Sequence, residues 1–214
     1  MAAGRITRAP LAGALLFALM APAAGAVSCP ADRIDRRARV AFVNDGDTVE
    51  LADGTRVRFI GINAPEIGHD EDEPDQPFGR AARRALRDLL DAAGGRLHLR
   101  FGRERRDDYG RLLAHAYLPD GRSIDRLLLE RGLAVRVTVP PNTRHHECYA
   151  RAERVARDAG RGVWTVPRFS GLPVAELPRD AGGFHVVTGS IERVGESRHA
   201  WWLVLDGLTL RLHK

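Results

Sequence analysis

The chain has 214 residues, of which 44% are hydrophobic and 29% charged, and 33 lysines and arginines against 28 aspartates and glutamates give a net charge of +5. This composition is typical of globular proteins and excludes a disordered or a collagen-like chain. The mildly basic balance is compatible with nucleic-acid binding but does not by itself indicate it.

An apolar run over residues 11–26 follows the basic residues Arg5 and Arg8 at the start of the chain. The run is too short to span a membrane comfortably. A basic start, an apolar stretch and small residues at its end are instead features of a secretory signal peptide. We therefore expect residues 1–26 to be a signal peptide that is cleaved before Val27. The mature protein is then expected to be periplasmic or secreted, with no membrane span.

Export would place the two cysteines of the chain, Cys29 and Cys148, in an oxidising compartment. Because disulfides persist in oxidising compartments, we expect these cysteines to pair and to close most of the mature chain into one loop. The alternative is that Cys29 carries a lipid, but the preceding Ala26-Val27-Ser28 matches the usual Leu-Ala-Gly-type sequence poorly. A diacylglycerol adduct on Cys29, detected by mass spectrometry, would exclude the disulfide.

Alternating apolar residues predict three short antiparallel strands between residues 38 and 59. Turns are expected at Asp45-Gly46-Asp47 and at Asp53-Gly54, because both sequences are rich in turn-forming residues. Residues 67–76 are acidic and lack periodicity, which indicates an exposed loop. An amphipathic helix is predicted over residues 78–93.

The next segment predicts strands over residues 97–101 and 112–118, joined by a charged tip at 103–108. Helices follow over about 123–131 and 143–159, each ended by a glycine. The face of the second helix that we expect to point inward comprises Cys148, Ala152, Val155 and Ala159.

The C-terminal part of the chain has a different character. Residues 167–183 are rich in proline, glycine and serine, and we expect a linker or a wrapping segment. Strands at 184–191, 201–205 and 208–212 then predict a small β extension over residues 184–214. About thirty residues bury an independent core with difficulty, so we expect this extension to pack on the main domain.

Three separated polar clusters contain candidate catalytic residues: Asp45-Gly46-Asp47-Thr48, the run 58–66, and Asp107-Asp108-Tyr109-Gly110-Arg111. Each cluster alone is weak evidence for a catalytic site, because Asp-Gly turns and exposed charges are common on protein surfaces. Together they supply two arginines, a carboxylate for acid–base chemistry and an oxygen-rich cation site. Cleavage of a phosphodiester requires such a set: guanidinium groups bind the anion, a hard cation neutralises it and a carboxylate deprotonates water.

The order and spacing of these motifs resemble those of the thermonuclease, or staphylococcal-nuclease-like, family over about residues 38–164. The matching motifs are Asp-Gly-Asp-Thr, Gly-x-x-Ala-Pro-Glu and Tyr-Gly-Arg. The resemblance implies an α+β fold with a five-stranded OB-fold β-barrel and about three helices, in a domain at 38–166 that follows an N-terminal segment at 27–37. It also implies calcium-dependent hydrolysis of phosphodiester bonds in DNA and/or RNA, and we expect a monomer.

Residue by residue, the resemblance assigns catalysis to Arg58, Glu66 and Arg111. The two arginines would bind the phosphate, and Glu66 would orient or deprotonate the attacking water. Tyr109 would contact a neighbouring phosphate or sugar. Alternation supports Arg58 independently, because its position in a strand points it away from the core.

The same resemblance makes Asp47, Asn63 and the Ala64 carbonyl the calcium ligands. Asn63 stands where the family usually has an aspartate, so the site loses a negative charge but keeps an oxygen that can coordinate. Because the number of charged ligands controls calcium affinity, we expect weaker calcium binding.

Two other departures concern the substrate. Asp108 takes the place of a basic residue next to Tyr109, and Val137 and Val139 stand where tyrosines can stack on a base. Since stacking contributes ~1–3 kcal/mol per base, its loss predicts poorer substrate affinity rather than loss of chemistry. The alternative is a non-catalytic nuclease-like barrel that binds nucleic acid or protein. The retained catalytic residues argue against this alternative, and the altered metal site argues for it.

Overall fold

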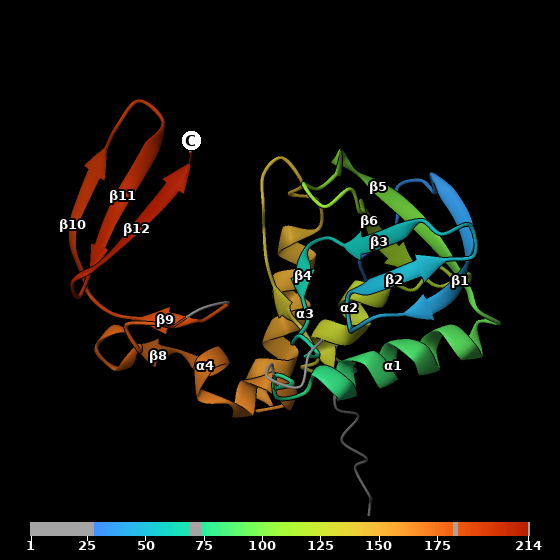
Figure 1. Ribbon diagram of the computed structural model, residues 1–214, viewed down its shortest axis with the longest axis horizontal. Helices are drawn as coiled ribbons and strands as arrows, with labels where there is room; N and C mark the ends of the chain where they lie inside the picture. Colours follow the sequence, from blue (N-terminus) through green and yellow to red (C-terminus); the bar gives the residue numbers. More distant parts are fainter. Residues whose placement is uncertain (1–27, 69–73, 182–183, 214) are drawn as a thin grey trace, which may run out of the picture.

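The computed structural model of the protein describes residues 28–68, 74–181 and 184–213 (Figure 1). The expected signal peptide, residues 1–26, and its cleavage site lie outside these residues. None of the helices in the described segments combines the length and the apolar character that a membrane span needs.

Five strands close into a barrel in the order β1-β2-β3-β6-β5 (Figure 1). Neighbouring strands are antiparallel except β3 and β6, which are parallel. The strands are β1 (Arg36–Val43), β2 (Thr48–Leu51), β3 (Arg56–Phe59), β5 (Arg96–Arg106) and β6 (Leu112–Tyr117). This arrangement confirms the expected α+β fold with a five-stranded OB-fold barrel.

Alternation along the short strands decides which side chains enter the barrel. The inward residues of β2 and β3 are Val49, Leu51, Val57 and Phe59, and all are buried. Arg58, between two of them, points to the opposite face and is partly exposed. The barrel core therefore fixes the direction of a predicted site residue.

Three helices cover the barrel and confirm the expected number. They are α1 (Gly79–Ala92), α2 (Ile124–Glu130) and α3 (His146–Asp158). Helix α1 runs alongside the barrel (Figure 1) and buries Ala82, Leu86, Leu89 and Leu90. Helix α2 begins after Ser123, whose Oγ accepts a hydrogen bond from the Arg126 backbone N–H at 3.2 Å.

The buried face of α3 differs from the predicted one. The buried residues of the helix are Cys148, Tyr149, Ala152 and Ala156. The prediction was correct for Cys148 and Ala152 but wrong for Val155, which is 42% exposed, and for Ala159, which is exposed. The large ring of Tyr149 is fully buried, so the inward face turns toward it. The helix also begins three residues later than expected, after His145 in a left-handed conformation with φ 62°.

Strand β5 is longer than predicted. We expected it to stop at the charged run 103–108, but it continues to Arg106, which pairs with Leu112 of β6. The residues of this outer half are exposed, so their charged side chains reach water without leaving the strand. The turn between β5 and β6 therefore contains only residues 107–111.

Two short strands lie outside the barrel, β4 (Ile62–Asn63) and β7 (Val135–Arg136), and they pair antiparallel. The short 3-10 helix η1 (Gly162–Thr165) follows α3 and carries the buried Trp164. Trp164 belongs to a second apolar cluster with Val163 and Phe169.

The segment expected to be a linker contains short elements. These are α4 (Pro167–Ser170), β8 (Leu172–Pro173) and η2 (Val174–Glu176), and β8 pairs with β9 (Val187–Thr188). Beyond them, β10 (Ile191–Glu196), β11 (Ala200–Leu205) and β12 (Leu208–His213) form a three-stranded sheet.

This sheet stands apart from the barrel (Figure 1). The contact expected between the extension and the main domain is made by Phe184, not by the sheet. Phe184 packs with Phe169 against the cluster around Trp164. The predicted strand at 184–191 is divided, because β9 ends at Thr188 and β10 begins at Ile191. A short parallel pair and an apolar cluster thus attach the extension.

A disulfide joins Cys29 to Cys148, as predicted. Both cysteines are buried, and their Cα atoms are 5.8 Å apart. The bond fastens the N-terminal segment to α3 and encloses the barrel strands within its loop.

A group of hydrogen-bonded aromatic and acidic side chains lies between β6 and the helices. Tyr149 donates a hydrogen bond to Asp125 Oδ2 at 2.7 Å, and its hydroxyl lies 3.0 Å from His115 Nδ1. Tyr117 is hydrogen-bonded through its hydroxyl to His145 Nε2 at 2.8 Å. Burial, followed by repulsion from His115, lowers the pKa of His145 to about 4.

Because the pKa of His145 is lowered, the free energy of unfolding should depend on pH through this residue. The unfolded chain binds a proton at His145 near pH 6.5, so the stability that this residue contributes is lost as the pH falls from about 6.5 to 4. Burial raises the pKa of Asp47, so this residue acts in the opposite direction, and wild type and variant are therefore compared at each pH. We expect His145→Asn to lower the free energy of unfolding more at pH 7 than at pH 4.5. The difference between the two effects should be about 1–2 kcal/mol, a value reduced because His145 is partly exposed, and urea unfolding at both pH values measures it.

Val155→Ala, which changes an exposed side chain of α3 without removing a titratable group, provides the control. Its effect on the free energy of unfolding should be the same at both pH values. A difference between wild type and His145→Asn that does not change with pH would contradict the prediction.

Candidate active site

The turn before β2 packs directly on the segment that follows β4. A Cβ atom on Gly46 would lie 2.6 Å from the Cβ atoms of both Ala64 and Ala82, so only glycine allows this approach. The close contact brings Asp47 next to Ala64, although seventeen positions separate them in the sequence.

Asp47, Arg58 and Asn63 form one hydrogen-bonded network. Arg58 Nε lies 3.0 Å from Asp47 Oδ1, and the Arg58 guanidinium donates to Asn63 Oδ1 at 2.9 Å and to the Ile62 carbonyl at 3.0 Å. The second oxygen of Asp47 accepts a hydrogen bond from the Ala64 N–H at 2.6 Å. The structure thus brings together four of the residues that the sequence predicts.

Asp47 is only 2% exposed, and this burial raises its pKa to about 7. The carboxylates of Asp45 and Glu66 act in the same direction, whereas Arg58 opposes them. Burial therefore favours the neutral form of the Asp47 carboxyl group. A cation bound beside it would favour the ionised form.

The donors at this place suit a hard cation. Asp47 offers a carboxylate, Asn63 an amide oxygen and Ala64 a carbonyl, and oxygen is the ligand that calcium prefers. Within the described parts of the chain, no group of three or more His, Cys, Asp or Glu side chains is placed to hold a metal. A cation would therefore depend on the Asn63 amide and on backbone oxygen.

Glu66 lies in the loop after β4 and its side chain is exposed. Its backbone is held by Gln76, whose Oε1 accepts from the Glu66 N–H at 3.2 Å and whose N–H donates to the Glu66 carbonyl at 2.9 Å. A Cβ atom on Gly79 would lie 2.6 Å from that carbonyl, so the start of α1 also packs on it. These contacts fix the backbone from which the carboxylate projects.

Arg111 ends the turn between β5 and β6. Its Nε donates to Asp107 Oδ2 at 2.7 Å and its N–H donates to Asp107 Oδ1 at 2.9 Å. Burial alone would raise the pKa of Asp107, but the hydrogen bonds from Arg111 hold that pKa below its ordinary value. The Arg111 guanidinium lies 5.3 Å above the ring of Tyr109, which is 83% exposed.

One cavity is lined by both of the predicted catalytic arginines. It has a volume of about 260 Å³, and both Arg58 and Arg111 line it, although 53 positions separate them in the sequence. Val137 and Val139, the expected substitutes for stacking tyrosines, line the same cavity. Asp47, Asn63, Glu66 and Tyr109 are not among its lining residues.

Sequence reasoning missed two residues of this cavity. Asp107, the partner of Arg111, was noticed only as part of a motif, yet its spacing of four residues from Arg111 could have indicated the pair. Asn142 comes from the loop before α3, and no signal in the sequence connected it to the barrel.

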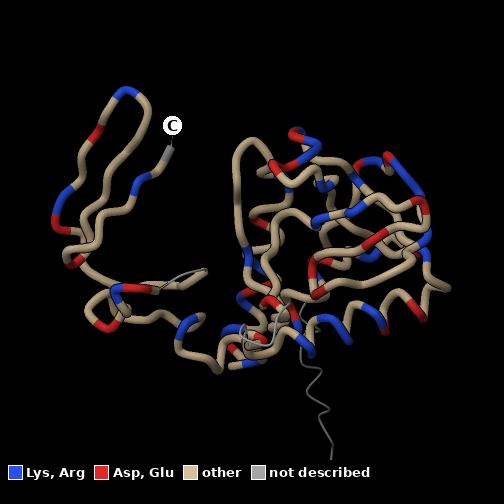
Figure 2. Tube along the Cα trace, in the orientation of Figure 1, with Lys and Arg blue, Asp and Glu red and all other residues tan. Residues whose placement is uncertain are grey.

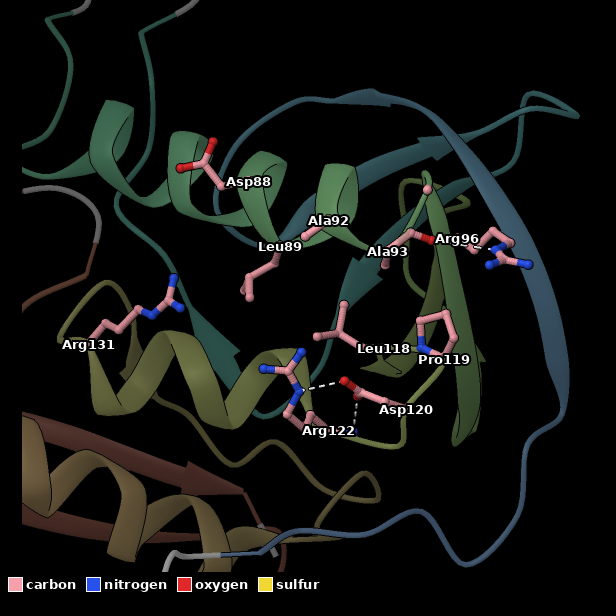
Figure 3. A pocket seen from close by; sticks show the side chains of 11 residues that line it. Asp88, Leu89, Ala92, Ala93, Arg96, Leu118, Pro119, Asp120, Arg122 and Arg131 are labelled. Carbon is pink, nitrogen blue, oxygen red and sulfur yellow. Dashed lines mark hydrogen bonds and ion pairs between the residues drawn. The ribbon is translucent and has the colours of Figure 1, made fainter.

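A larger cavity, about 520 Å³ in volume, lies between the end of α1 and the loop that leads from β6 to α2 (Figure 3). Its charged residues include Arg131 and the ion pair of Asp120 with Arg122, whose atoms are 2.7 Å apart. None of the predicted site residues lines it. The candidate active site therefore lies at the cavity shared by Arg58 and Arg111.

Comparison with known proteins gives a consistent result. Residues 56–166 match the family described as staphylococcal nuclease homologue. The chain is 34% identical to the thermonuclease of Staphylococcus intermedius over 125 residues, which are 57% of this chain and 72% of that protein.

Two proteins of Bacillus subtilis are also similar. The endonuclease YncB is 34% identical over 126 residues, which are 56% of this chain and 58% of that protein. The SPbeta prophage-derived endonuclease YokF is likewise 34% identical over 126 residues, or 56% of this chain, but the match spans only 41% of its own length.

Proposed function

Because the chain belongs to the staphylococcal nuclease family, we propose that it hydrolyses phosphodiester bonds in DNA, RNA or both. The observation that carries this proposal is the cavity that Arg58 and Arg111 line together, with Arg58 also bound to the buried Asp47. Two guanidinium groups suit a phosphate, because arginine binds phosphate oxygens through charge-assisted hydrogen bonds. To bind the phosphate, Arg58 would exchange its hydrogen bonds to Asn63 and to the Ile62 carbonyl for hydrogen bonds to the phosphate oxygens.

In the proposed mechanism, Arg58 and Arg111 hold the scissile phosphate and stabilise the charge that develops on its oxygens. Glu66 accepts a proton from the attacking water, whose oxygen bonds to phosphorus as the bond to the leaving oxygen breaks, and the leaving oxygen takes a proton from solvent. Asp47, Asn63 and the Ala64 carbonyl would hold calcium. When bound, calcium would supply positive charge against the phosphate.

The test is hydrolysis of single-stranded DNA and RNA by the purified, oxidised mature protein. Calcium would be varied up to millimolar concentrations, and a chelator would be added in parallel. Cleavage that requires calcium and stops with the chelator supports the proposal. Folded protein that binds DNA but cleaves nothing at any calcium concentration would favour the non-catalytic binding barrel instead.

We expect Asn63→Asp to bind calcium roughly tenfold more tightly than the wild type, since an added negative ligand raises calcium affinity. Isothermal titration calorimetry measures this change directly. Asn63→Ala, which removes the oxygen without adding charge, is the matched control and should bind more weakly than the wild type. Equal affinities of wild type and Asn63→Asp would show that this position does not ligate calcium.

We also propose that the protein is exported to the periplasm or secreted. The apolar run at residues 11–26 and the disulfide between Cys29 and Cys148 support this location. Cell fractionation, with mass spectrometry of the recovered protein, tests it. A mass that begins at Val27 and lacks two hydrogens is expected, whereas intact protein confined to the cytoplasm would contradict it.

A further inference from the structure

A third cavity, about 430 Å³ in volume, adjoins the active-site cavity. Ile60 and Asn142 line both cavities, so the two share a wall. The third cavity is called the arginine cavity below, because its lining includes Arg33, Arg100, Arg103, Arg105 and Arg144. The proposed mechanism uses none of these five arginines.

Two carboxylates partly neutralise the arginine cavity. The buried Arg100 lies 2.8 Å from Asp32 and 3.0 Å from Asp35. Asp32 also lies 3.2 Å from Arg144. Asp35 lies 2.9 Å from Arg33. Because three arginines share two carboxylates, this part of the wall keeps a net positive charge.

The remaining two arginines, Arg103 and Arg105, stand on the exposed half of β5. In the part of the chain that the structure describes, neither has a carboxylate within ion-pair distance. The Arg105 guanidinium lies 5.3 Å above the ring of Phe101, which holds its direction. Glu104, between them, lines the active-site cavity instead. Two uncompensated positive charges therefore face the arginine cavity.

The wall between the two cavities is tightly packed. Asn142 Oδ1 accepts a hydrogen bond from the Glu104 N–H at 3.1 Å, and its Nδ2 donates to the Glu104 carbonyl at 3.1 Å. A Cβ atom on Gly102 would lie 2.7 Å from Asn142 Oδ1. The loop before α3 is therefore held against β5 between the two cavities.

We propose that the arginine cavity binds the backbone phosphates of a single-stranded nucleic acid next to the phosphate held at the active site. This inference rests on the proposed function. Guanidinium groups bind phosphate oxygens and stack on bases, and a positive groove that follows the backbone is the usual way in which proteins hold single strands. The strand passes between the two cavities over Ile60 and Asn142.

The test compares long and short single strands. Binding of fluorescent DNA oligonucleotides of two and of fifteen nucleotides is measured by anisotropy in the Glu66→Gln background, with calcium present and at several salt concentrations. We expect Arg103→Ala/Arg105→Ala to weaken binding of the longer strand roughly ten- to a hundredfold at low salt. The slope of log affinity against log salt should fall by about 1.4, because two single-strand phosphate contacts are lost. Binding of the dinucleotide should not change.

The matched control is Arg84→Ala/Arg87→Ala, which removes the same charge from the exposed face of α1, where basic positions also gather (Figure 2). This control should leave the salt slope within experimental error of the parent. Equal losses from both double variants, or no loss from either, would overturn the proposal, even if the wild type hydrolyses DNA. Conversely, wild type that cleaves neither strand but shows the arginine-dependent binding would refute the proposed function and leave this inference intact. Selective loss of binding to an acidic peptide, with unchanged binding to the longer strand, would point to a protein partner and overturn it.

Discussion

Replacing Glu66 by Gln should lower the rate of calcium-dependent DNA hydrolysis by ~10²–10⁴, the range expected when a general base is removed. The substitution keeps the size of the side chain and removes its charge. Gln76 holds the Glu66 backbone through two hydrogen bonds, and the substitution leaves these in place. The measurement is kcat under saturating DNA and calcium, with the melting temperature as the check on folding.

We expect the two catalytic arginines to have a similarly large effect on the rate of DNA hydrolysis. Arg58→Ala and Arg111→Ala should each lower the rate by ~10³–10⁵, by comparison with arginines in phosphoryl transfer. Arg58 also pairs with the buried Asp47, so its removal should additionally lower stability. Arg111→Lys keeps the charge but loses the planar donors, and partial activity in this variant would show that bidentate geometry matters. A loss below tenfold in Glu66→Gln, Arg58→Ala and Arg111→Ala alike would refute the assigned roles.

The second large effect concerns the disulfide. In the chain-entropy model, a cross-link between residues 119 positions apart stabilises a protein by ~4–5 kcal/mol. We expect the double variant Cys29→Ala/Cys148→Ala to lose this amount in urea unfolding, which corresponds to a fall in Tm of about 10–15 °C for a chain of this length. The cavities left by the two buried thiols add a further small loss.

Reduction of the wild type provides the control for that variant. If the cross-link itself stabilises the protein, unfolding in dithiothreitol should shift the wild type toward the double variant and leave the double variant unchanged. A reduced wild type that unfolds at the same urea concentration as the oxidised protein would contradict the prediction.

Much of the barrel could be predicted from the sequence because its strands are short and half-buried. Val49 and Phe59 alternate with polar residues, and this pattern also gave the direction of Arg58. The helix at α1 followed from its apolar stripe. The motifs also predicted that Asp47 and Asn63 belong to one site, and the structure joins these two residues through Arg58.

Other features depend on contacts that no local pattern records. The inward face of α3 turns toward Tyr149 because that ring meets Asp125, which lies on another helix. The charged outer half of β5 stays extended because its end pairs with β6, although its composition resembles that of a loop. The arginine cavity could not be predicted at all, since Arg33 and Arg144 reach it from segments at opposite ends of the domain.

The parallel pairing of β3 with β6 has a consequence for how activity and folding are connected. Leu112 lies opposite Val57 and Leu113 opposite Arg58, so Arg111, which directly precedes β6, is set relative to Arg58 by this pairing. A slip of one residue would shift the two guanidinium groups by about 3.3 Å and send the side chains of one strand to the wrong face. The pairing of β3 with β6 therefore sets the distance between the two arginines. We expect nuclease activity to be lost whenever these two strands separate, even while the helices remain formed.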